Sequence, residues 1–136
     1  MNTASVTYLG ELRTQATHIR SGQAIITDAP VDNHGKGEAF SPTDLLTTAL
    51  ITCMITTMGI AAQGRGWDMG AVSGEVLKVM ANNPRRVEKA IMSIEIRGNR
   101  LDAEQRHTLE QIGIHCPVAR SLHPDLVVET EFKYVD

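Results

Sequence analysis

The sequence predicts an α+β fold in which an antiparallel sheet packs against a long central helix and a second, shorter helix. Two observations carry this prediction. Segments of alternating apolar and polar residues lie on both sides of one long helical stripe, and a second helical segment precedes the last alternating segment. The order of strands, long helix, two strands, helix and strand is typical of the α+β class. At 136 residues, we expect a single domain over 1–136.

Residues 1–40 are expected to form the N-terminal strands. Apolar side chains at Val6 and Tyr8 alternate with polar ones, and this pattern predicts a strand. Ser21-Gly22 predicts a hairpin turn into a short strand over Ala24–Thr27. The stretch from Asp28 to Ala39 mixes charges with a proline and two glycines, so we expect a loop there.

The central helix is predicted over 42–63. Ser41 can cap free backbone N–H groups, Pro42 fits the first helical position, and the charge of Asp44 suits the helix dipole. Gly64-Arg65-Gly66 indicates the end of the helix. The predicted buried stripe follows steps of three and four residues: Leu46, Ala49, Leu50, Cys53, Met54, Thr57, Met58 and Ala61.

The remaining elements are predicted in the C-terminal half. Alternating patterns favour strands over 70–81 and 87–97 and a last strand over 126–135. A helix is expected over 103–113, because Asp102 and Gln105 match a capping box and Gly113 is typical of a helix end.

Composition narrows the class of protein. The net charge is −3 and the basic residues are scattered, which argues against a nucleic-acid partner. The longest apolar segment, 45–62, is interrupted by threonines, which argues against a membrane span. The N-terminus lacks a secretory signal pattern, so we expect a cytoplasmic protein.

The two cysteines, Cys53 and Cys116, are the candidate chemical groups. In a reducing cytosol such a pair indicates reversible thiol chemistry, metal binding, or two buried apolar side chains. A metal site from these thiols and His115 has only three ligands and lacks the usual spacing. Cys116 lies at an element boundary fixed by Pro117, which suits a resolving thiol.

Cys53 lies in the middle of the predicted helix, where the helix dipole does little to lower a thiol pKa. A reactive thiolate there needs a positive side chain from elsewhere in the fold. Arg13 is the first candidate because it lies on the polar face of the first strand pair, and Arg20 is its rival. Lys36, His34 and His115 are further candidates.

Two acidic residues are candidates for supporting the site. Asp44 lies nine residues before Cys53, which places it roughly 180° around the helix and about 13 Å along the axis. Asp44 therefore cannot touch Cys53 on its own helix, and a capping role is favoured. Glu38, in the preceding loop, is the alternative acid; it can fold back toward the site or remain solvated.

Two separate runs of the sequence carry a resemblance to a known family: Gly37 to Leu46 with the later Cys53, and His115 to Leu122. The first run resembles the first block of the OsmC/Ohr family of organic hydroperoxide reductases. The second run resembles the second block of that family, in the form of the general OsmC-like subgroup. The best-known branch has Glu directly after the helix-start proline, whereas this chain has Thr43 there and Asp44 one place later.

The resemblance implies an intertwined homodimer that reduces small organic hydroperoxides at the subunit interface. Cys53 is then the attacking thiolate, Cys116 its disulfide partner, and Arg13 and Asp44 the supporting charges. An external dithiol, a lipoyl group in the best-known branch, restores the thiols, and no metal or bound cofactor is involved. The alternative is a non-enzymatic redox sensor or a small-ligand-binding protein on the same scaffold.

Overall fold

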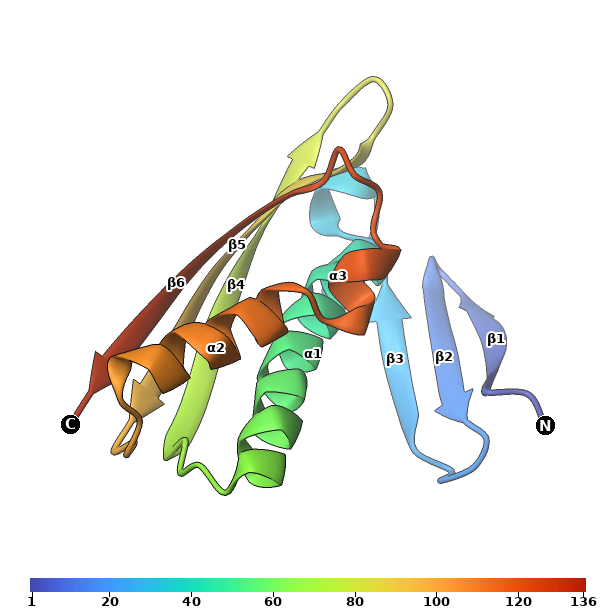
Figure 1. Ribbon diagram of the computed structural model, residues 1–136. Coiled ribbons are helices and arrows are strands. Elements are labelled where there is room, and N and C mark those ends of the chain that lie inside the picture. The colour runs from blue at the N-terminus through green and yellow to red at the C-terminus, as the bar shows by residue number, and fades with distance from the viewer. The chain divides into compact units, whose positions relative to one another are not determined.

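The computed structural model describes residues 1–136 and divides into two compact units, Met1–Leu46 and Thr47–Asp136 (Figure 1). The first unit contains a three-stranded sheet, and the second combines a three-stranded sheet with helices. The predicted α+β class is confirmed.

The first unit is an antiparallel sheet in the order β1-β2-β3. Its strands are β1 (Ala4–Gly10), β2 (Arg13–His18) and β3 (Ala24–Asp28). The β1–β2 turn places Glu11 and Leu12 at positive φ angles of 54° and 63°. Arg13 and Asp28 are cross-strand partners at the end of β2 and β3. A short 3-10 helix, η1 (Val31–Asn33), lies in the loop that follows.

The long helix α1 spans Pro42–Arg65 and begins with a reciprocal cap. The backbone N–H of Asp44 donates to Ser41 Oγ at 3.0 Å, and the N–H of Ser41 donates to Asp44 Oδ2 at 3.0 Å. Two otherwise unpaired N–H groups are thereby satisfied. The helix ends where Gly66 takes a φ of 68°, a conformation that glycine adopts without steric cost.

The second unit contains a mixed sheet in the order β4-β5-β6. Its elements are β4 (Ala71–Ala81), β5 (Arg86–Arg97), α2 (Ala103–Ile114), α3 (Pro117–Ser121) and β6 (Val127–Val135). β4 and β5 pair antiparallel, but β5 and β6 pair parallel, so the expectation of a wholly antiparallel sheet is wrong for the last strand. The reason is the connection: α2 and α3 carry the chain back to the end at which β5 starts.

The core of this unit lies between α1 and one face of the sheet. Leu50, Met54 and Met58 of α1 are buried, as are Met92 and Ile94 of β5. Gly74 makes room for the helix, since a Cβ there would lie 2.8 Å from Ile51 Cδ1 and 3.4 Å from Ile55 Cδ1. The helix thus packs directly on β4.

The buried stripe of α1 differs from the predicted one. Ile51 and Ala62 are buried, whereas Leu46 is 39% exposed. The buried positions of α1 follow steps of three or four residues that start at Thr47. The buried stripe is therefore shifted by about one residue from the predicted stripe, which starts at Leu46. Cys53 and Thr57 therefore lie at the edge of the buried face and are half-buried. The Cys53 side chain is thus partly accessible to solvent.

Gly113 does not end the second helix as the sequence predicted. α2 continues to Ile114, and Gly113 is buried within it. A Cβ at this position would lie 2.8 Å from Met58 Cγ and 2.9 Å from Met58 Sδ. The glycine therefore permits α2 to pack closely on α1. The capping box of Asp102 and Gln105 at the start of α2 is present.

By length and composition alone, one helix, α1, is apolar enough to cross a membrane. In the structure its buried positions are covered by protein, and a core helix can meet the same two criteria.

Candidate active site

The second unit brings Cys53 and Cys116 into contact. Cys53 lies on α1, and Cys116 is the residue that precedes α3. Both thiols are free, and the S–H of Cys116 donates a hydrogen bond to the sulfur of Cys53. Cys116 is completely buried, whereas Cys53 is half-buried. A small molecule can therefore reach Cys53 more readily than Cys116.

The two thiols have opposite pKa shifts. Burial raises the pKa of Cys53, but hydrogen bonds from the Val118 N–H, the Cys116 S–H and the Thr57 hydroxyl bring it below its ordinary value. Burial raises the pKa of Cys116 above its ordinary value, despite a bond from the Ala119 N–H, and the contact with Cys53 raises it further. Cys53 is thus the first of the pair to ionise, and the thiolate is the nucleophilic form.

Two residues at this site were not predicted from the sequence as site residues, Val118 and Thr57. Thr57 lies one helical turn after Cys53, with its Oγ1 3.8 Å from the Cys53 Sγ. Val118 supplies a backbone N–H from the start of α3, where such groups have no partner within the helix. Pro117, a typical first helical residue, was the signal that could have located the Val118 donor, and the four-residue spacing from Cys53 was the signal for Thr57.

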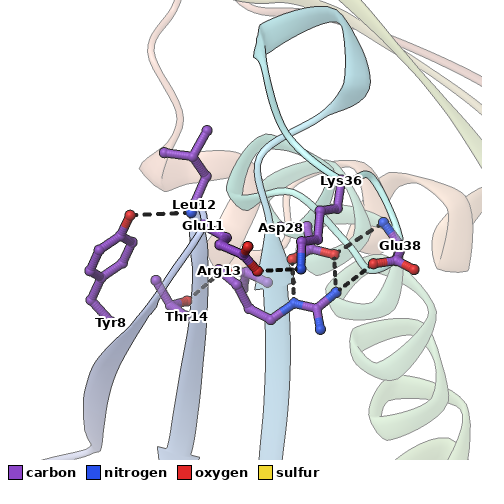
Figure 2. Close-up of polar contacts among 9 residues, drawn as sticks. Tyr8, Glu11, Leu12, Arg13, Thr14, Asp28, Lys36 and Glu38 are labelled. Carbon is purple, nitrogen blue, oxygen red and sulfur yellow. Dashed lines mark hydrogen bonds and ion pairs between the residues drawn. The ribbon is translucent and has the colours of Figure 1, made fainter.

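The first unit holds Arg13 in a carboxylate cluster, drawn in Figure 2. Arg13 Nε donates to Asp28 Oδ1 at 2.7 Å, and its Nη2 donates to Asp28 Oδ2 at 2.8 Å. The same Nη2 donates to Glu38 Oε1 at 3.0 Å. A bidentate pair of this kind fixes the plane of the guanidinium. Arg13 is therefore an oriented side chain and not a solvated strand arginine.

Asp28 is the residue on which this cluster depends, and the sequence pattern did not select it. Its side chain is 1% exposed and also accepts the backbone N–H of Glu38 at 3.0 Å. Hydrogen bonding from Arg13 holds the pKa of Asp28 below its usual value and raises that of Arg13. A position at the end of a short strand, two residues before a proline, gave no signal of burial.

The other candidates of the sequence analysis also have definite places. Asp44 belongs to the cap of α1, with Ser41 as its partner, in the first unit. Arg20 is exposed in the turn after β2. Lys36 Nζ forms an ion pair with Glu11 Oε2 at 2.6 Å (Figure 2). His34 is the exposed left-handed residue that follows η1, and His115 follows α2.

The Asp28 carboxylate is expected to make stability depend on pH in the acid range. Because its pKa is lowered by folding, its contribution is fully present above the unfolded value of about 3.9 and is lost as the pH falls through the folded value. The wild-type melting temperature should fall on acidification below about pH 5. Asp28→Asn should melt lower at pH 7 and lose less on acidification. Thermal unfolding followed by circular dichroism from pH 7 to pH 3 measures both. An Asp28→Asn profile parallel to that of wild type would contradict the assignment, and the exposed Asp125→Asn is the control.

No group of three or more His, Cys, Asp and Glu side chains in the chain is placed to hold a metal ion. The third candidate ligand, His115, instead points Nδ1 to the Gln111 carbonyl at 2.8 Å.

Comparison with known proteins places the chain in a family. The family model for OsmC-like protein matches residues 35–131. An osmotic-stress-induced and detoxification-response protein from Psychrobacter arcticus 273-4 is 48% identical, with a TM-score of 0.91 over 97% of this chain and 96% of that one. Organic hydroperoxide resistance proteins share the fold at low identity. The one from Legionella pneumophila has 14% identity and a TM-score of 0.73 over 98% of both chains. The one from Elizabethkingia anophelis has 13% identity and a TM-score of 0.76 over 98% of this chain and 97% of that one.

A search of the curated proteins found no significant match. The family match covers most of the chain and includes both cysteines, and the chain belongs to the OsmC-like protein family.

Proposed function

We propose that this protein reduces organic hydroperoxides, with Cys53 as the attacking thiolate and Cys116 as the resolving thiol. The observation that carries the proposal is the direct contact of two thiols with opposite pKa shifts. The more acidic thiol is also the more accessible one. A peroxidatic cysteine needs both properties.

The chemistry proceeds in two steps. The Cys53 thiolate attacks the terminal oxygen of the hydroperoxide, the O–O bond breaks, and the alkoxide leaves and takes up a proton to become the alcohol. Cys53 is then a sulfenic acid. Cys116 loses its proton and attacks the Cys53 sulfur, the S–S bond forms, the S–O bond breaks, and water leaves. An external dithiol returns two electrons and restores both thiols.

The comparisons support this choice. Two proteins with the same fold are named as organic hydroperoxide resistance proteins, and the relative at 48% identity is named for detoxification. The homodimer, the external dithiol and a cytoplasmic location, which the sequence led us to expect, belong to the same proposal.

Removal of the Cys53 sulfur should abolish the reaction. The test is consumption of cumene hydroperoxide with dithiothreitol as the reductant. Wild type should turn over, and Cys53→Ser should be slower by more than about a thousandfold, as expected for loss of a covalent nucleophile. Unchanged consumption in Cys53→Ser would overturn the proposal. Oxidation of the wild-type pair without turnover would instead favour a redox sensor.

Arg13 is proposed as the guanidinium that supports the thiolate, in preference to Arg20. Its orientation is fixed by Asp28, and fixed donors stabilise developing charge better than mobile ones. Arg13→Gln should slow the reaction of Cys53 with cumene hydroperoxide by about a hundredfold. Arg20→Gln, at an exposed turn residue, is the matched control and should react within about twofold of wild type. The reverse ranking in stopped-flow traces would assign the role to Arg20.

A further inference from the structure

Thr57 differs from two other helical threonines in the partner of its hydroxyl group. The hydroxyls of Thr52 and Thr108 each donate to a backbone carbonyl, three and four residues earlier in the helix, at 3.0 Å. Such bonds to the preceding turn are usual for a threonine within a helix. The Thr57 Oγ1 instead lies 3.8 Å from the Cys53 Sγ. The hydroxyl of Thr57 is thus paired with a reactive sulfur and not with the backbone.

Ionisation of Cys53 sets the direction of this contact. A thiolate carries no hydrogen and can only accept, so the Thr57 hydroxyl must donate to it. Burial raises the pKa of Cys53, and three hydrogen bonds lower it again, from the Val118 N–H, the Cys116 S–H and the Thr57 hydroxyl. The nucleophilic form of Cys53 therefore has the Thr57 hydrogen directed at its sulfur.

Among these three donors, Thr57 alone also lines a pocket, which has a volume of about 380 Å³. The other lining residues of this pocket are Gln111, Ile112, His115 and Arg120. Cys116 is completely buried, and the Val118 donor is an amide, which keeps its hydrogen at neutral pH. A space of this size admits several water molecules. A proton given up by the half-buried Thr57 can therefore be replaced from solvent.

His115 is the other group in the pocket that has to be considered as a proton donor. Its Nδ1 lies 2.8 Å from the Gln111 carbonyl, and because a carbonyl only accepts, Nδ1 carries the hydrogen. The second ring nitrogen, Nε2, then has no hydrogen to donate while the ring is neutral. The side chain of Arg120 does not release a proton in a protein. The Thr57 hydroxyl is thus the donor that combines contact with the sulfur and access to the pocket.

The first step of the proposed reaction creates a base that needs a proton. As the Cys53 thiolate attacks the terminal oxygen of the hydroperoxide, the O–O bond breaks and an alkoxide leaves. The new S–O bond removes the negative charge from the sulfur, so the Thr57 hydroxyl loses its acceptor. At the same moment the departing alkoxide becomes the stronger acceptor nearby, and an alkoxide is basic enough to take the proton of an alcohol.

We propose that Thr57 is a catalytic residue whose hydroxyl donates first to the Cys53 thiolate and then to the departing alkoxide. The inference rests on the proposed function, because it names the source of the proton that the same reaction consumes. The electron pair of the thiolate forms the S–O bond, and the pair of the O–O bond leaves with the alkoxide. The Thr57 proton moves to that oxygen, and a water molecule restores the hydroxyl and becomes hydroxide.

The test compares two oxidants that differ in their need for a proton. Cumene hydroperoxide releases an alkoxide, whereas peracetic acid releases acetate, a weak base at neutral pH. Thr57→Val keeps the shape of the side chain and removes the hydroxyl. It should slow oxidation of Cys53 by cumene hydroperoxide by about ten- to a hundredfold and oxidation by peracetic acid by less than about threefold. Thr57→Ser should stay within about threefold of wild type with both oxidants.

A measurement without any peroxide separates proton donation from the effect of the hydroxyl on the thiolate. The pH dependence of Cys53 alkylation by iodoacetamide gives the thiolate fraction of each variant, and the oxidation rates are expressed per thiolate. Thr57→Val should raise the pKa of Cys53, because one donor to the thiolate is lost. Thr52→Val, at an exposed threonine of the same helix, is the matched control and should change neither the pKa nor the rates.

Three results would refute the role of Thr57. Equal slowing with both oxidants in Thr57→Val would show that the hydroxyl only activates or positions the sulfur. A loss in Thr57→Ser as large as in Thr57→Val would show that the hydroxyl is not the group that matters. A rate ratio that changes in His115→Gln but not in Thr57→Val would assign the proton to the imidazole.

Failure of the proposed function has a separate signature. In that case folded wild type would reduce cumene hydroperoxide no faster than the urea-unfolded chain does. Each Cys53 thiolate that cumene hydroperoxide oxidises, however slowly, still releases the same alkoxide. The ratio of the two oxidation rates in Thr57→Val and wild type therefore decides the role of Thr57 in either case.

Discussion

Cys116→Ser is expected to stop the reaction at the sulfenic acid of Cys53. One equivalent of cumene hydroperoxide should convert wild type to an intramolecular disulfide, whereas the variant should form no disulfide. The variant should still react once, within about tenfold of the wild-type rate, because Cys116 supplies only one of three hydrogen bonds to the Cys53 sulfur. Excess hydroperoxide should then drive Cys53 to the sulfinic acid, which dithiothreitol does not reduce.

Mass spectrometry after trapping with dimedone reads out these products. Cys53→Ser serves as the control, since it should give neither the adduct nor a disulfide. A disulfide between two chains in wild type, or a dimedone adduct on Cys116, would contradict the assignment of roles. Retention of the sulfenic acid in wild type would show that the contact of the two thiols does not lead to a bond.

Gly113→Ala should destabilise the protein even though alanine is the better helix former. The change gains about 1 kcal/mol in helix propensity. Against this, the added Cβ would lie 2.8 Å from Met58 Cγ, and Met58 is completely buried. Overpacking of this kind costs about 1–3 kcal/mol, so we expect a net loss of about 1 kcal/mol. Gly113→Val adds two further methyl groups and should lose about 3 kcal/mol.

Thermal and urea unfolding measure these differences, and the chain provides a matched control. Gly64 lies in α1, where an added Cβ would have no neighbouring atom within 4 Å, so Gly64→Ala should be stabilising by about 0.5–1 kcal/mol. Opposite signs for the two Gly→Ala changes are therefore expected. In a Met58→Ala background the cost of Gly113→Ala should shrink, because the overlapping atoms are absent. Equal effects of Gly113→Ala in both backgrounds would rule out the contact with Met58 as the cause.

Local signals in the sequence were enough to place the helix starts. Ser41 and Asp44 satisfy each other's backbone N–H groups at the start of α1, and Asp102 and Gln105 do so at the start of α2. Such caps involve residues three apart, so their chemistry is readable from the chain alone. The family blocks identified the cysteines in the same local way.

The packing between distant segments could not be predicted from the sequence. The rotation of the buried stripe on α1 depends on where the sheet meets the helix, and a shift of one residue changes burial at Leu46 and Ile51. Gly113 has the same appearance in sequence whether it ends a helix or admits a neighbouring side chain. The parallel pairing of β6 depends on the path of α2 and α3, which no local pattern encodes.

The electrostatics of the candidate site could likewise be predicted only in part. Cys53 lies in the middle of its helix, so the sequence predicts that groups from other segments must stabilise its thiolate. One of these groups is the backbone N–H of Val118. Every residue except proline has a backbone N–H, so the sequence does not single this one out. Asp28 was missed because its role depends on burial and on pairing with Arg13 fifteen residues earlier. Side-chain identity alone does not distinguish it from a solvated loop aspartate.

The unequal burial of the two thiols also bears on how the enzyme cycle would close. In thiol–disulfide exchange the incoming thiolate must approach along the axis of the S–S bond and displace the far sulfur. Cys116 is fully enclosed and Cys53 is half-buried, so a reductant would meet the Cys53 sulfur and Cys116 would be the leaving group. In the proposed cycle the mixed disulfide would then be carried by Cys53, and regeneration would be regioselective. The hydroperoxide and the reductant would thus both have to reach the Cys53 sulfur from the same side of the protein, so they would compete for access to it.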